Sequence, residues 1–386
     1  MIGEFHKLYG GESEVHVYRA PGRVNLIGEH TDYNLGFVLP IALDLATYTA
    51  CAPADDGQLH LRSERFKQEL HIPVDRIAGA KPTRQWTDYV VGVAQQILRA
   101  GFTIAPKNLL IRSTVPEGSG LSSSAALEVS AALALLDGRQ IEPLKLAQLC
   151  QRAENEFIGM PSGIMDQYVS VFGQAHRAIE LDCRSLTHQL VELPPGVEIV
   201  AVNSLVKHEL ARSAYRDRTE ECAMAVDALA RRYPEVKSLR DATMQQLERT
   251  PLPAVVARRA RHVITEIARV GLFVNASKRG DIERMGELFT ESHLSLQHDY
   301  EVSCAELDFL VNAAAGIDGV YGARMTGGGF GGCTVNLVRP EAVEKFRTAI
   351  VRAYREPFGI TAPVFRCVPS QGAGVVQNFA RIPVVD

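Results

Sequence analysis

The chain has 386 residues, which is too long for one small hydrophobic core and predicts two domains. Its composition, with 46% hydrophobic and 22% charged residues, is that of a globular protein. The formal net charge of −4 argues against nucleic acid as the main partner, because binding to a phosphate backbone needs a concentrated basic face.

The locally basic run ARRARH, at 257–262, is expected to be the solvated face of an amphipathic helix. Seven scattered cysteines without a CxxC pair are typical of free thiols in a reducing compartment. The start has no apolar segment of the signal-peptide kind, and the most apolar stretch, 125–136, is shorter than the roughly 20 residues that a bilayer requires. We therefore expect a cytoplasmic protein without membrane contact or an obligate protein partner.

In the N-terminal half, strands are predicted at 14–21 and 36–52, with Pro21 and Gly22 ending the first so that Arg23 begins a loop. The further elements, in chain order, are a hairpin over 59–65 and 68–74, a helix over 86–101, a strand over 107–116 and helices over 122–138 and 142–159. A proline pair at 194–195 is the expected boundary between domains 1–195 and 196–386. Beyond it we predict a strand over 197–204, a long helix from Arg212, and strands over 319–327 and 332–340.

The segment PEGSGLSSSAAL, at 116–127, lies between a predicted strand and the N-terminus of a predicted helix. Glycines let backbone N–H groups come close to a ligand, and the helix dipole favours an anion. The three serines add hydroxyls that can cap the helix, donate to phosphate or bind a metal. This arrangement favours phosphate binding, although no Walker A lysine is present.

A second glycine-rich segment, MTGGGFGGC at 325–333, satisfies GxGxxG literally. The residues after it, CTVNLV, have the pattern of a strand, whereas a dinucleotide-binding fold requires a helix there. We therefore interpret the segment as a turn between two strands, where backbone can approach a ligand closely.

Ionisable residues gather in two further segments. GRVNLIGEHTDYN, at 22–34, places charges close together that could form a solvated turn or the wall of a polar pocket. In AENEFIGMPSGIMDQY, at 153–168, Glu154 lies on a predicted helix and Asp166 follows a break at Pro161 and Gly163. Two such acids can point at one site, where they could hold Mg²⁺ and orient a hydroxyl nucleophile.

These segments carry a resemblance to a known family. GRVNLIGEHTDYN resembles the galactokinase signature, GSGLSSSAA the phosphate loop of the GHMP small-molecule kinases, and MTGGGFGGC their third motif. MPSGIMDQY is similar to the galactokinase stretch around the catalytic aspartate. The motifs follow the family's order from about residue 18 to about residue 335.

The resemblance implies an α+β fold with two domains and an active site in the cleft between them. The N-terminal GHMP kinase domain would resemble domain 2 of ribosomal protein S5 and contain a left-handed βαβ unit. The C-terminal domain would be ferredoxin-like. Right-handed crossovers are the general rule, so periodicity alone would predict the other hand.

The implied activity is transfer of the γ-phosphate of ATP, with Mg²⁺, to the anomeric C1 hydroxyl of D-galactose, the first committed step of galactose catabolism. By matching position, Asp166 accepts the sugar's proton or orients its hydroxyl, and Arg23 stabilises developing charge. The implied sugar-binding residues are Glu29, His30, Thr31, Asp32 and Tyr215. The implied phosphate-binding residues are Gly118, Ser119, Gly120, Leu121, Ser122, Ser123 and Ser124. Ser124 and Glu154 match the magnesium ligands.

Several of these assignments have alternatives. Tyr215 could be a half-buried helix residue, and Trp86 with Tyr89 could either enclose adenine or pack in the core. An ordinary aspartate has a pKa of about 3.9 and is a weak base at pH 7, so we expect orientation and electrostatics to dominate catalysis. Many galactokinases have cysteine where this chain has Ser162, a difference from which we expect little consequence.

Other functions remain to be weighed against this one. Mevalonate and homoserine kinases bind charged substrates and need a cation, whereas the EHTD segment offers carboxylates that accept hydrogen bonds from a neutral polyol. Kinases of N-acetylgalactosamine or arabinose are not distinguished by this argument. A non-enzymatic sugar sensor would have lost residues of the phosphate loop, but Ser124, Ala125 and Asp166 are all present.

Overall fold

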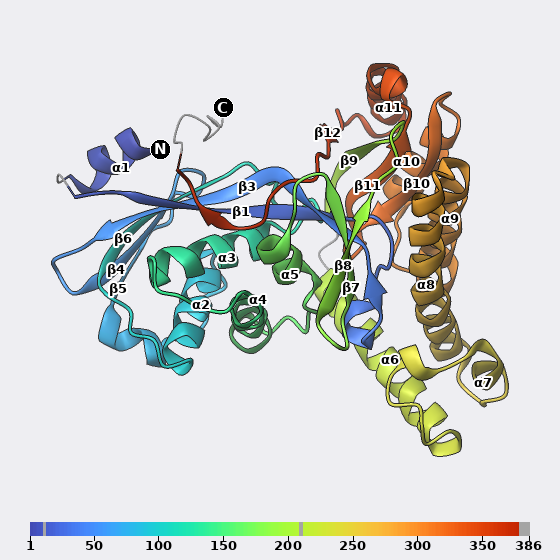
Figure 1. The fold of residues 1–386 in the computed structure, drawn as a ribbon, viewed down its shortest axis with the longest axis horizontal. Coiled ribbons are helices and arrows are strands. Elements are labelled where there is room, and N and C mark those ends of the chain that lie inside the picture. The colour runs from blue at the N-terminus through green and yellow to red at the C-terminus, as the bar shows by residue number, and fades with distance from the viewer. Residues whose placement is uncertain (11–12, 208–210, 378–386) are drawn as a thin grey trace.

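The computed structural model describes residues 1–10, 13–207 and 211–377 of the chain. Figure 1 shows two lobes, one built on a broad twisted sheet with helices beneath it and the other rich in long helices. None of the helices in these ranges has both the length and the apolar character that crossing a membrane requires.

The first lobe is built on a six-stranded sheet. Its strands pair antiparallel except β4 and β6, which pair in parallel with helix α2 between them in the chain. This β4–α2–β6 connection is the βαβ unit of the expected fold. In order across the sheet, the strands are β13 (Gly374–Val375), β1 (His16–Asn25), β3 (Pro40–Pro53), β6 (Lys107–Ser113), β4 (Gln58–Ser63) and β5 (Leu70–Pro73).

Helices pack on both faces of this sheet. Side chains alternate along β3, so that Cys51 faces the core under α2 and α3, while Tyr48 and Ala50 face Phe5 of α1 on the other side. The predicted Ala- and Leu-rich helix is α3, which is buried along most of its length. The helices of this lobe are α1 (Ile2–Tyr9), α2 (Thr87–Arg99), α3 (Ser123–Leu136), α4 (Pro143–Arg152), a π-helical turn (Ala153–Ile158) and α5 (Met165–Phe172).

The second lobe has a four-stranded antiparallel sheet. Its order is β10 (Val320–Thr326), β11 (Gly331–Val338), β9 (Glu198–Lys207) and β12 (Val364–Arg366). The chain order, with helices between β9 and β10 and between β11 and β12, is the β-α-β-β-α-β pattern of ferredoxin-like domains. Its helices are α6 (Ala211–Arg232), α7 (Met244–Glu248), α8 (Ala254–Arg279), α9 (Ile282–Ser295), a π-helical turn (Leu296–Tyr300), α10 (Ala305–Ala315) and α11 (Val343–Phe358).

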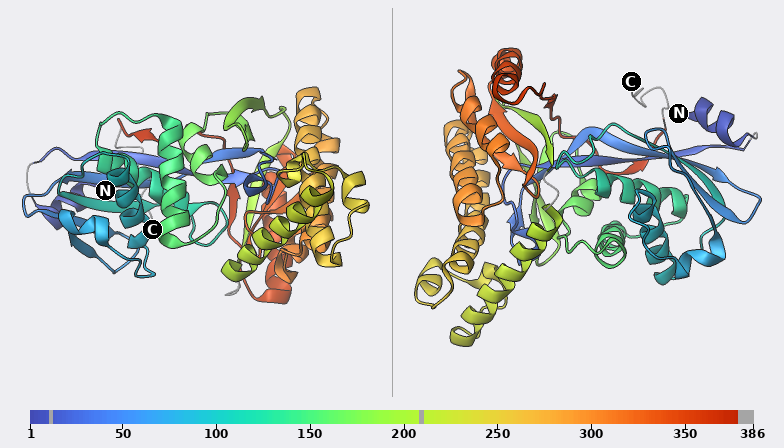
Figure 2. Two further views of the ribbon diagram at one scale, coloured as in Figure 1. Left: turned by 90° about the horizontal axis from the view of Figure 1, so that it is seen from below. Right: turned by 180° about the vertical axis from the view of Figure 1, so that it is seen from behind.

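The two lobes share one hydrophobic core. Val24 and Leu26 at the end of β1 pack in the same cluster as Phe273 of α8 and Phe289 of α9. The chain also crosses back, because β13 near the C-terminus pairs with β1 in the first sheet, as Figures 1 and 2 show. A small third sheet, of β2 (Phe37–Val38), β7 (Arg177–Asp182) and β8 (Thr187–Glu192), lies where the lobes meet.

One element differs from its prediction. The expectation that Pro21 and Gly22 end the first strand is wrong, because β1 continues to Asn25. The pairing with β3 shifts its register between Pro21 and Arg23, and this bulge accommodates a proline that has no N–H to donate. The glycine-rich segment at 325–333 is the predicted turn between two strands, β10 and β11.

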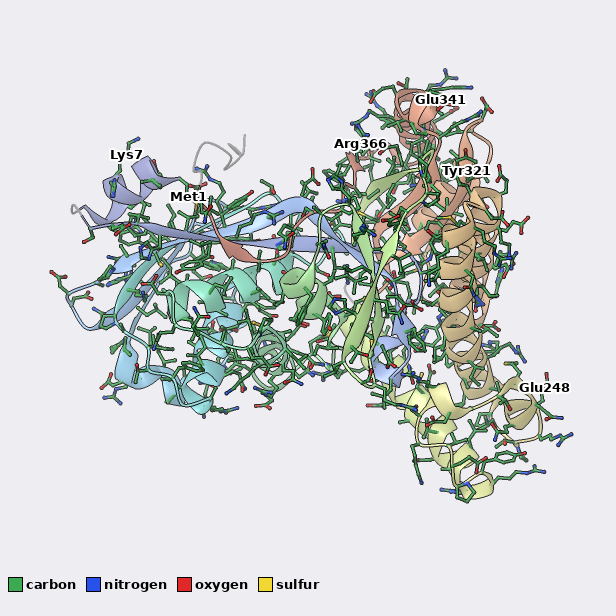
Figure 3. All side chains as sticks on the ribbon, in the orientation of Figure 1. Met1, Lys7, Glu248, Tyr321, Glu341 and Arg366 are labelled. Atoms are coloured by element: carbon green, nitrogen blue, oxygen red, sulfur yellow. The ribbon has the colours of Figure 1, made fainter. Side chains whose placement is uncertain are left out.

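Helix α9 packs closely on strand β10. A Cβ on Gly286 would lie 2.0 Å from the carbonyl oxygen of Tyr321, which Figure 3 labels on β10. We expect Gly286→Ala to lower the free energy of unfolding by about 2–3 kcal/mol, measured by urea titration, because the helix must move away from the strand.

The matched control is Gly271→Ala on α8, where a Cβ would meet no atom within 4 Å. This variant should gain up to about 1 kcal/mol, since alanine is the better helix former. Equal urea midpoints for Gly286→Ala and the wild type would show that the backbones are not in close contact there.

Candidate active site

A cleft of about 1210 Å³ is lined by residues of both lobes and brings the predicted motifs together. The first motif, the phosphate loop, the segment around Asp166 and the third motif all contribute to its wall. The predicted site residues that line it are Arg23, Glu29, His30, Asp32, Trp86, Gly118, Gly120, Ser122, Ser123, Ser124, Glu154, Asp166 and Tyr215.

The centre of the cleft is an ion pair between Arg23 and Asp166. Arg23 Nε donates to Asp166 Oδ1 at 2.9 Å and Arg23 Nη2 donates to Oδ2 at 2.8 Å, which is the bidentate geometry that suits a guanidinium. Arg23 is 5% exposed. Burial disfavours its charge, but the negative charges of Asp166 and Glu29 outweigh burial and raise its pKa. Asp166 lies in the first turn of α5, where the helix dipole stabilises an anion.

The phosphate loop is bonded directly to this ion pair. Arg23 Nη1 donates to the carbonyl of Gly120, and Ser122 Oγ donates to Asp166 Oδ2. Ser122 is the N-cap residue of α3 and has a left-handed φ of 59°, which turns its hydroxyl away from the helix and toward the carboxylate. Its side chain therefore serves Asp166 rather than capping the helix.

Three predicted site residues are placed behind the wall of the cleft. Thr31 is fully buried, and its Oγ1 lies 2.8 Å from the carbonyl oxygen of Gly28 and 2.6 Å from that of Phe37. Ser119 Oγ donates to the carbonyl of Pro116 at 2.7 Å, and the Leu121 side chain packs in the shared core. These residues fix the shape of the two loops that carry the site.

Glu29 ties the first motif to the third. Its Oε1 accepts hydrogen bonds from Thr326 Oγ1 at 3.0 Å and from the Gly327 N–H at 2.8 Å. Arg324 Nη2 lies 3.4 Å from the same oxygen, and both side chains are almost completely buried. Arg324 also donates to the carbonyl of Leu26 at 2.7 Å. Arg324 was not predicted as a site residue. An arginine inside a predicted strand was the feature of the sequence that could have indicated it.

Asp32 faces the cleft beside a glycine that leaves room for it. A Cβ on Gly163 would lie 1.9 Å from Asp32 Oδ2, so no larger residue fits at 163 while Asp32 keeps this position. Burial, followed by the negative charge of Asp166, raises the pKa of Asp32 to about 7.

Aromatic rings surround His30 at the same end of the cleft. The ring of Tyr215, on α6, lies 5.5 Å from the rings of both His30 and Tyr33, measured between centroids. His30 is 4% exposed, and burial lowers its pKa well below the ordinary value, so the imidazole is neutral near pH 7. Tyr215 belongs to the motif HELARSAYRDR, of which 208–210 lie outside the described residues.

Glu154 lies in the π-helical turn after α4, and one oxygen of its carboxylate accepts two hydrogen bonds. Ser162 Oγ donates to Oε2 at 2.7 Å and Gln167 Nε2 donates to the same atom at 3.0 Å. Burial raises the pKa of Glu154, while hydrogen bonds from Ser162 and Ser124 act in the opposite direction. The hydroxyl of Ser162 thus contacts a predicted metal ligand.

At the far end of the cleft, Trp86 stacks on Phe66 with ring centroids 5.9 Å apart and planes at 17°. Trp86 is the N-cap residue of α2, and its Nε1 donates to the carbonyl of Gln68 at 3.2 Å. Phe66 comes from the segment between β4 and β5, which sequence analysis treated only as the end of a hairpin.

The basic run 257–262 is not simply a solvated face. Arg259 is 3% exposed and pairs with Glu221 and Glu301, and His262 is fully buried. His262 Nε2 lies 3.1 Å from the carbonyl oxygen of Glu29, so α8 supports the first motif from behind. The prediction was wrong for these two residues because composition does not show which side of a long helix packs against other elements.

The raised pKa of Asp32 predicts a pH-dependent stability. Between about pH 4 and pH 7 the folded protein holds this proton more tightly than the unfolded chain, so stability falls as pH rises through that range. We expect Asp32→Asn to raise the free energy of unfolding at pH 8 by about 1–3 kcal/mol, with little gain at pH 4, in urea titrations.

The control for this experiment is Asp217→Asn, on the exposed surface of α6. It should change stability by the same small amount at both pH values. An equal gain for Asp32→Asn at pH 4 and pH 8 would contradict the placement of Asp32 in a buried, negatively charged setting.

The buried pair of Arg324 and Glu29 predicts strong coupling between the two residues. We expect Arg324→Met to lower the free energy of unfolding by about 3–5 kcal/mol, because the Glu29 charge stays buried without its partner. Adding Glu29→Gln should restore at least half of that loss, measured as a double-mutant cycle by urea titration. Additive losses in the double variant would show that the two side chains do not interact.

Comparison with known proteins gives the same pattern of motifs. The model of the galactokinase galactose-binding signature matches residues 3–53, the N-terminal domain of GHMP kinases matches 88–174, and the C-terminal domain of GHMP kinases matches 273–356. The chain is 45% identical to a galactokinase of Roseiflexus sp. over 98% of this chain and 97% of that one. It is 44% identical to a galactokinase of Chloroflexus aggregans over 96% of each chain.

Among solved structures, the fold is similar to that of Lactococcus lactis galactokinase, crystallised in complex with galactose. The TM-score is 0.92 at 35% identity, and the match covers 96% of this chain and 98% of that one. The two-domain GHMP kinase fold expected from the sequence is confirmed. Near-complete coverage at this identity, with a signature specific to one branch, places the chain in the galactokinase family.

Proposed function

We propose that this chain transfers the γ-phosphoryl group of ATP to the anomeric C1 hydroxyl of D-galactose, giving α-D-galactose 1-phosphate and ADP. The observation that carries the proposal is the bonding of one carboxylate, Asp166, to both a buried arginine and the phosphate loop. A hydroxyl that contacts Asp166 would lie beside the loop at which a nucleotide phosphate is expected.

Asp166 is suited to orienting one hydroxyl. A carboxylate has about four acceptor positions, and three of those on Asp166 accept hydrogen bonds from Arg23 and Ser122. The position that remains can accept the C1 hydroxyl proton of the sugar. Because phosphoryl transfer needs mainly positioning and charge stabilisation, an orienting aspartate and a fixed guanidinium supply what the reaction requires.

The sugar would occupy the end of the cleft at His30, Asp32 and Tyr215. Carboxylate and imidazole groups form hydrogen bonds with neutral hydroxyls, and an aromatic ring packs on the apolar face of a pyranose. Glu29 and Thr31 would act on the sugar through the shape of their loop, since their side chains are bonded to protein groups.

The phosphates would lie over the loop 118–124, against backbone N–H groups and the N-terminus of α3. Ser124 and Glu154 suit Mg²⁺, which prefers hard oxygen ligands, and a buried carboxylate with a raised pKa is stabilised by a cation. No group of three His, Cys, Asp or Glu side chains poised for a metal occurs in the described ranges, and Mg²⁺ typically needs only one or two such ligands beside phosphates. When bound, Mg²⁺ would neutralise charge on the transferring phosphate.

The adenine base would lie at the far end of the cleft, near the stacked rings of Trp86 and Phe66. Both residues line the cleft. Trp86 is thus proposed as a nucleotide contact, with Phe66 as its partner.

Release of ADP, measured by a coupled assay over a panel of substrates, tests the proposed function. The panel contains galactose, N-acetylgalactosamine, arabinose, mevalonate and homoserine. We expect the highest kcat/KM with galactose. An absence of turnover with galactose would refute the proposal, and Asp166→Asn retaining near-normal kcat would refute the role of Asp166.

Arg23 and Asp32 are expected to affect different kinetic constants. Arg23→Ala should lower kcat about 100- to 1000-fold, because it removes a preorganised cation from the reacting centre. Asp32→Ala should mainly raise KM for galactose, since it removes a sugar contact. Arg352→Ala, on the exposed side of α11, is the control and should change neither constant. The reverse assignment of kcat and KM effects would contradict this division of roles.

A further inference from the structure

Behind the sugar end of the cleft, four side chains, three of them buried and that of Tyr33 half-buried, form a row of hydrogen bonds that crosses from one lobe to the other. His30 Nδ1 lies 2.9 Å from Tyr33 Oη, which lies 2.7 Å from Tyr300 Oη, which in turn lies 3.2 Å from Cys222 Sγ. We call these residues, His30, Tyr33, Tyr300 and Cys222, the phenol relay. Of these four residues only His30 lines the cleft, so the proposed reaction gives the other three no role.

The relay is held rigidly by the second lobe. Tyr300 is fully buried at the end of the π-helical turn, and its carbonyl accepts a hydrogen bond from Arg218 Nε at 2.7 Å. The His262 ring packs on the Tyr300 ring with centroids 4.5 Å apart. His30 itself has a left-handed φ of 63°, an unusual conformation for a residue with a side chain, so surrounding contacts must hold it.

Every member of the relay carries one proton near pH 7. Burial lowers the pKa of His30 well below its ordinary value, which leaves a neutral ring with one N–H. Burial also raises the pKa of Tyr33 and Tyr300 well above theirs and that of Cys222 to about 11. Three links joining four single donors can therefore be arranged in four ways, and each way leaves one proton without an acceptor in the row, that of His30, Tyr33, Tyr300 or Cys222.

The surroundings of Cys222, at the end of the relay away from the cleft, distinguish these arrangements. Asn34 Nδ2, which can only donate, lies 3.7 Å from Cys222 Sγ. If the thiol donates to Tyr300 and both phenols donate toward His30, the sulfur accepts from Asn34 and the one proton left over is on Nε2 of His30. If the relay runs the other way, the sulfur receives two donors, and no further hydrogen-bond partner for its S–H exists among the described residues. In the other arrangements the leftover proton is on Tyr33, Tyr300 or Cys222, none of which lines the cleft, whereas in the first direction it is on His30, which does, so that a ligand can accept it.

That direction determines what His30 presents to the cleft. Tyr33 then donates to His30 Nδ1, so the ring proton is on Nε2. Nε2 has no hydrogen-bond partner within the described part of the protein, although it is buried and its residue lines the cleft. A buried N–H without a partner is costly, and a bound ligand oxygen would satisfy it.

We infer that the phenol relay holds His30 in the tautomer with a proton on Nε2, which makes His30 a hydrogen-bond donor to the sugar. Tyr33, Tyr300 and Cys222 are positioning residues. This inference rests on the proposed sugar site and deepens it. When ionised, Asp32 can accept a hydrogen bond from a sugar hydroxyl, whereas His30 donates one. The two side chains together therefore select a group that can both donate and accept hydrogen bonds, as a hydroxyl can.

Nitrogen-15 NMR of protein labelled at histidine reads the tautomer directly, without sugar or nucleotide. His30→Gln identifies the His30 signals among those of the 11 histidines. In the wild type we expect a protonated Nε2 and a bare, hydrogen-bonded Nδ1. In Tyr33→Phe and Tyr300→Phe we expect both signals to move toward the average of the two tautomers. A wild-type ring protonated on Nδ1 would overturn the inference.

Kinetics provide the second measurement. Tyr300→Phe should raise KM for galactose about 3- to 30-fold, with kcat and KM for ATP within about threefold of the wild type, because one well-placed hydrogen bond is weakened. Cys222→Ala should show a smaller rise in the same constant. Cys222→Ser, which keeps a donor at that position, should restore both the NMR signals and the KM.

Tyr354→Phe is the matched control. Tyr354 is also fully buried in the second lobe and donates one hydrogen bond, to the carbonyl of Ser204 at 3.0 Å, but it is not part of the relay. It should leave the His30 signals and the galactose KM unchanged. Equal effects of Tyr354→Phe and Tyr300→Phe, or no effect of Tyr300→Phe on either readout, would overturn the inference. If the wild type does not phosphorylate galactose, the proposed function fails, while the NMR measurement still decides the tautomer.

Discussion

Two buried guanidinium groups make it possible to bury so many carboxylates around one cleft. Arg23 is bonded to Asp166 and Arg324 lies beside Glu29, and neither arginine is more than 5% exposed. Taking a carboxylate out of water costs several kcal/mol unless a partner compensates its charge. Asp32 shows what happens without such a partner. Its neighbour Arg23 is bonded to Asp166, and burial raises the pKa of Asp32 to about 7. The two arginines thus give Asp166 and Glu29 the cationic partners that Asp32 lacks.

The same arginines join parts of the chain that are distant in sequence. Arg23 connects β1 to the phosphate loop through the carbonyl of Gly120 and to α5 through Asp166. Arg324 connects β10 of the second lobe to the backbone at the end of β1. Because both sets of bonds converge on β1 and the loop that follows it, the sugar end and the phosphate end of the cleft are fixed to one strand.

Motifs that act locally could be predicted from the sequence, while contacts between segments distant along the chain could not. The strand–loop–helix setting of Ser122 to Ser124 and the turn at 327–330 depend on neighbouring residues, and both were predicted correctly. The course of β1 past Pro21 was missed because a bulge accommodates the proline only when β3 is alongside. Arg324, His262 and Phe66 were missed for the same kind of reason, since nothing near them in sequence shows what they face. Likewise, the spacing that grouped Thr31 with His30 and Asp32 does not show that its side chain turns inward.

The pairing of β13 with β1 has a consequence for synthesis of the chain on the ribosome. β1 emerges long before the strand that covers its outer edge, at Gly374–Val375. Until then, the first sheet has an open edge at which Tyr18 and Arg19 lack their final neighbours, and such edges are prone to pair with other chains. The packing of Val24 and Leu26 against α8 and α9 is likewise delayed. The first sheet of the nascent chain is therefore open to pairing with other chains until β13 has been made.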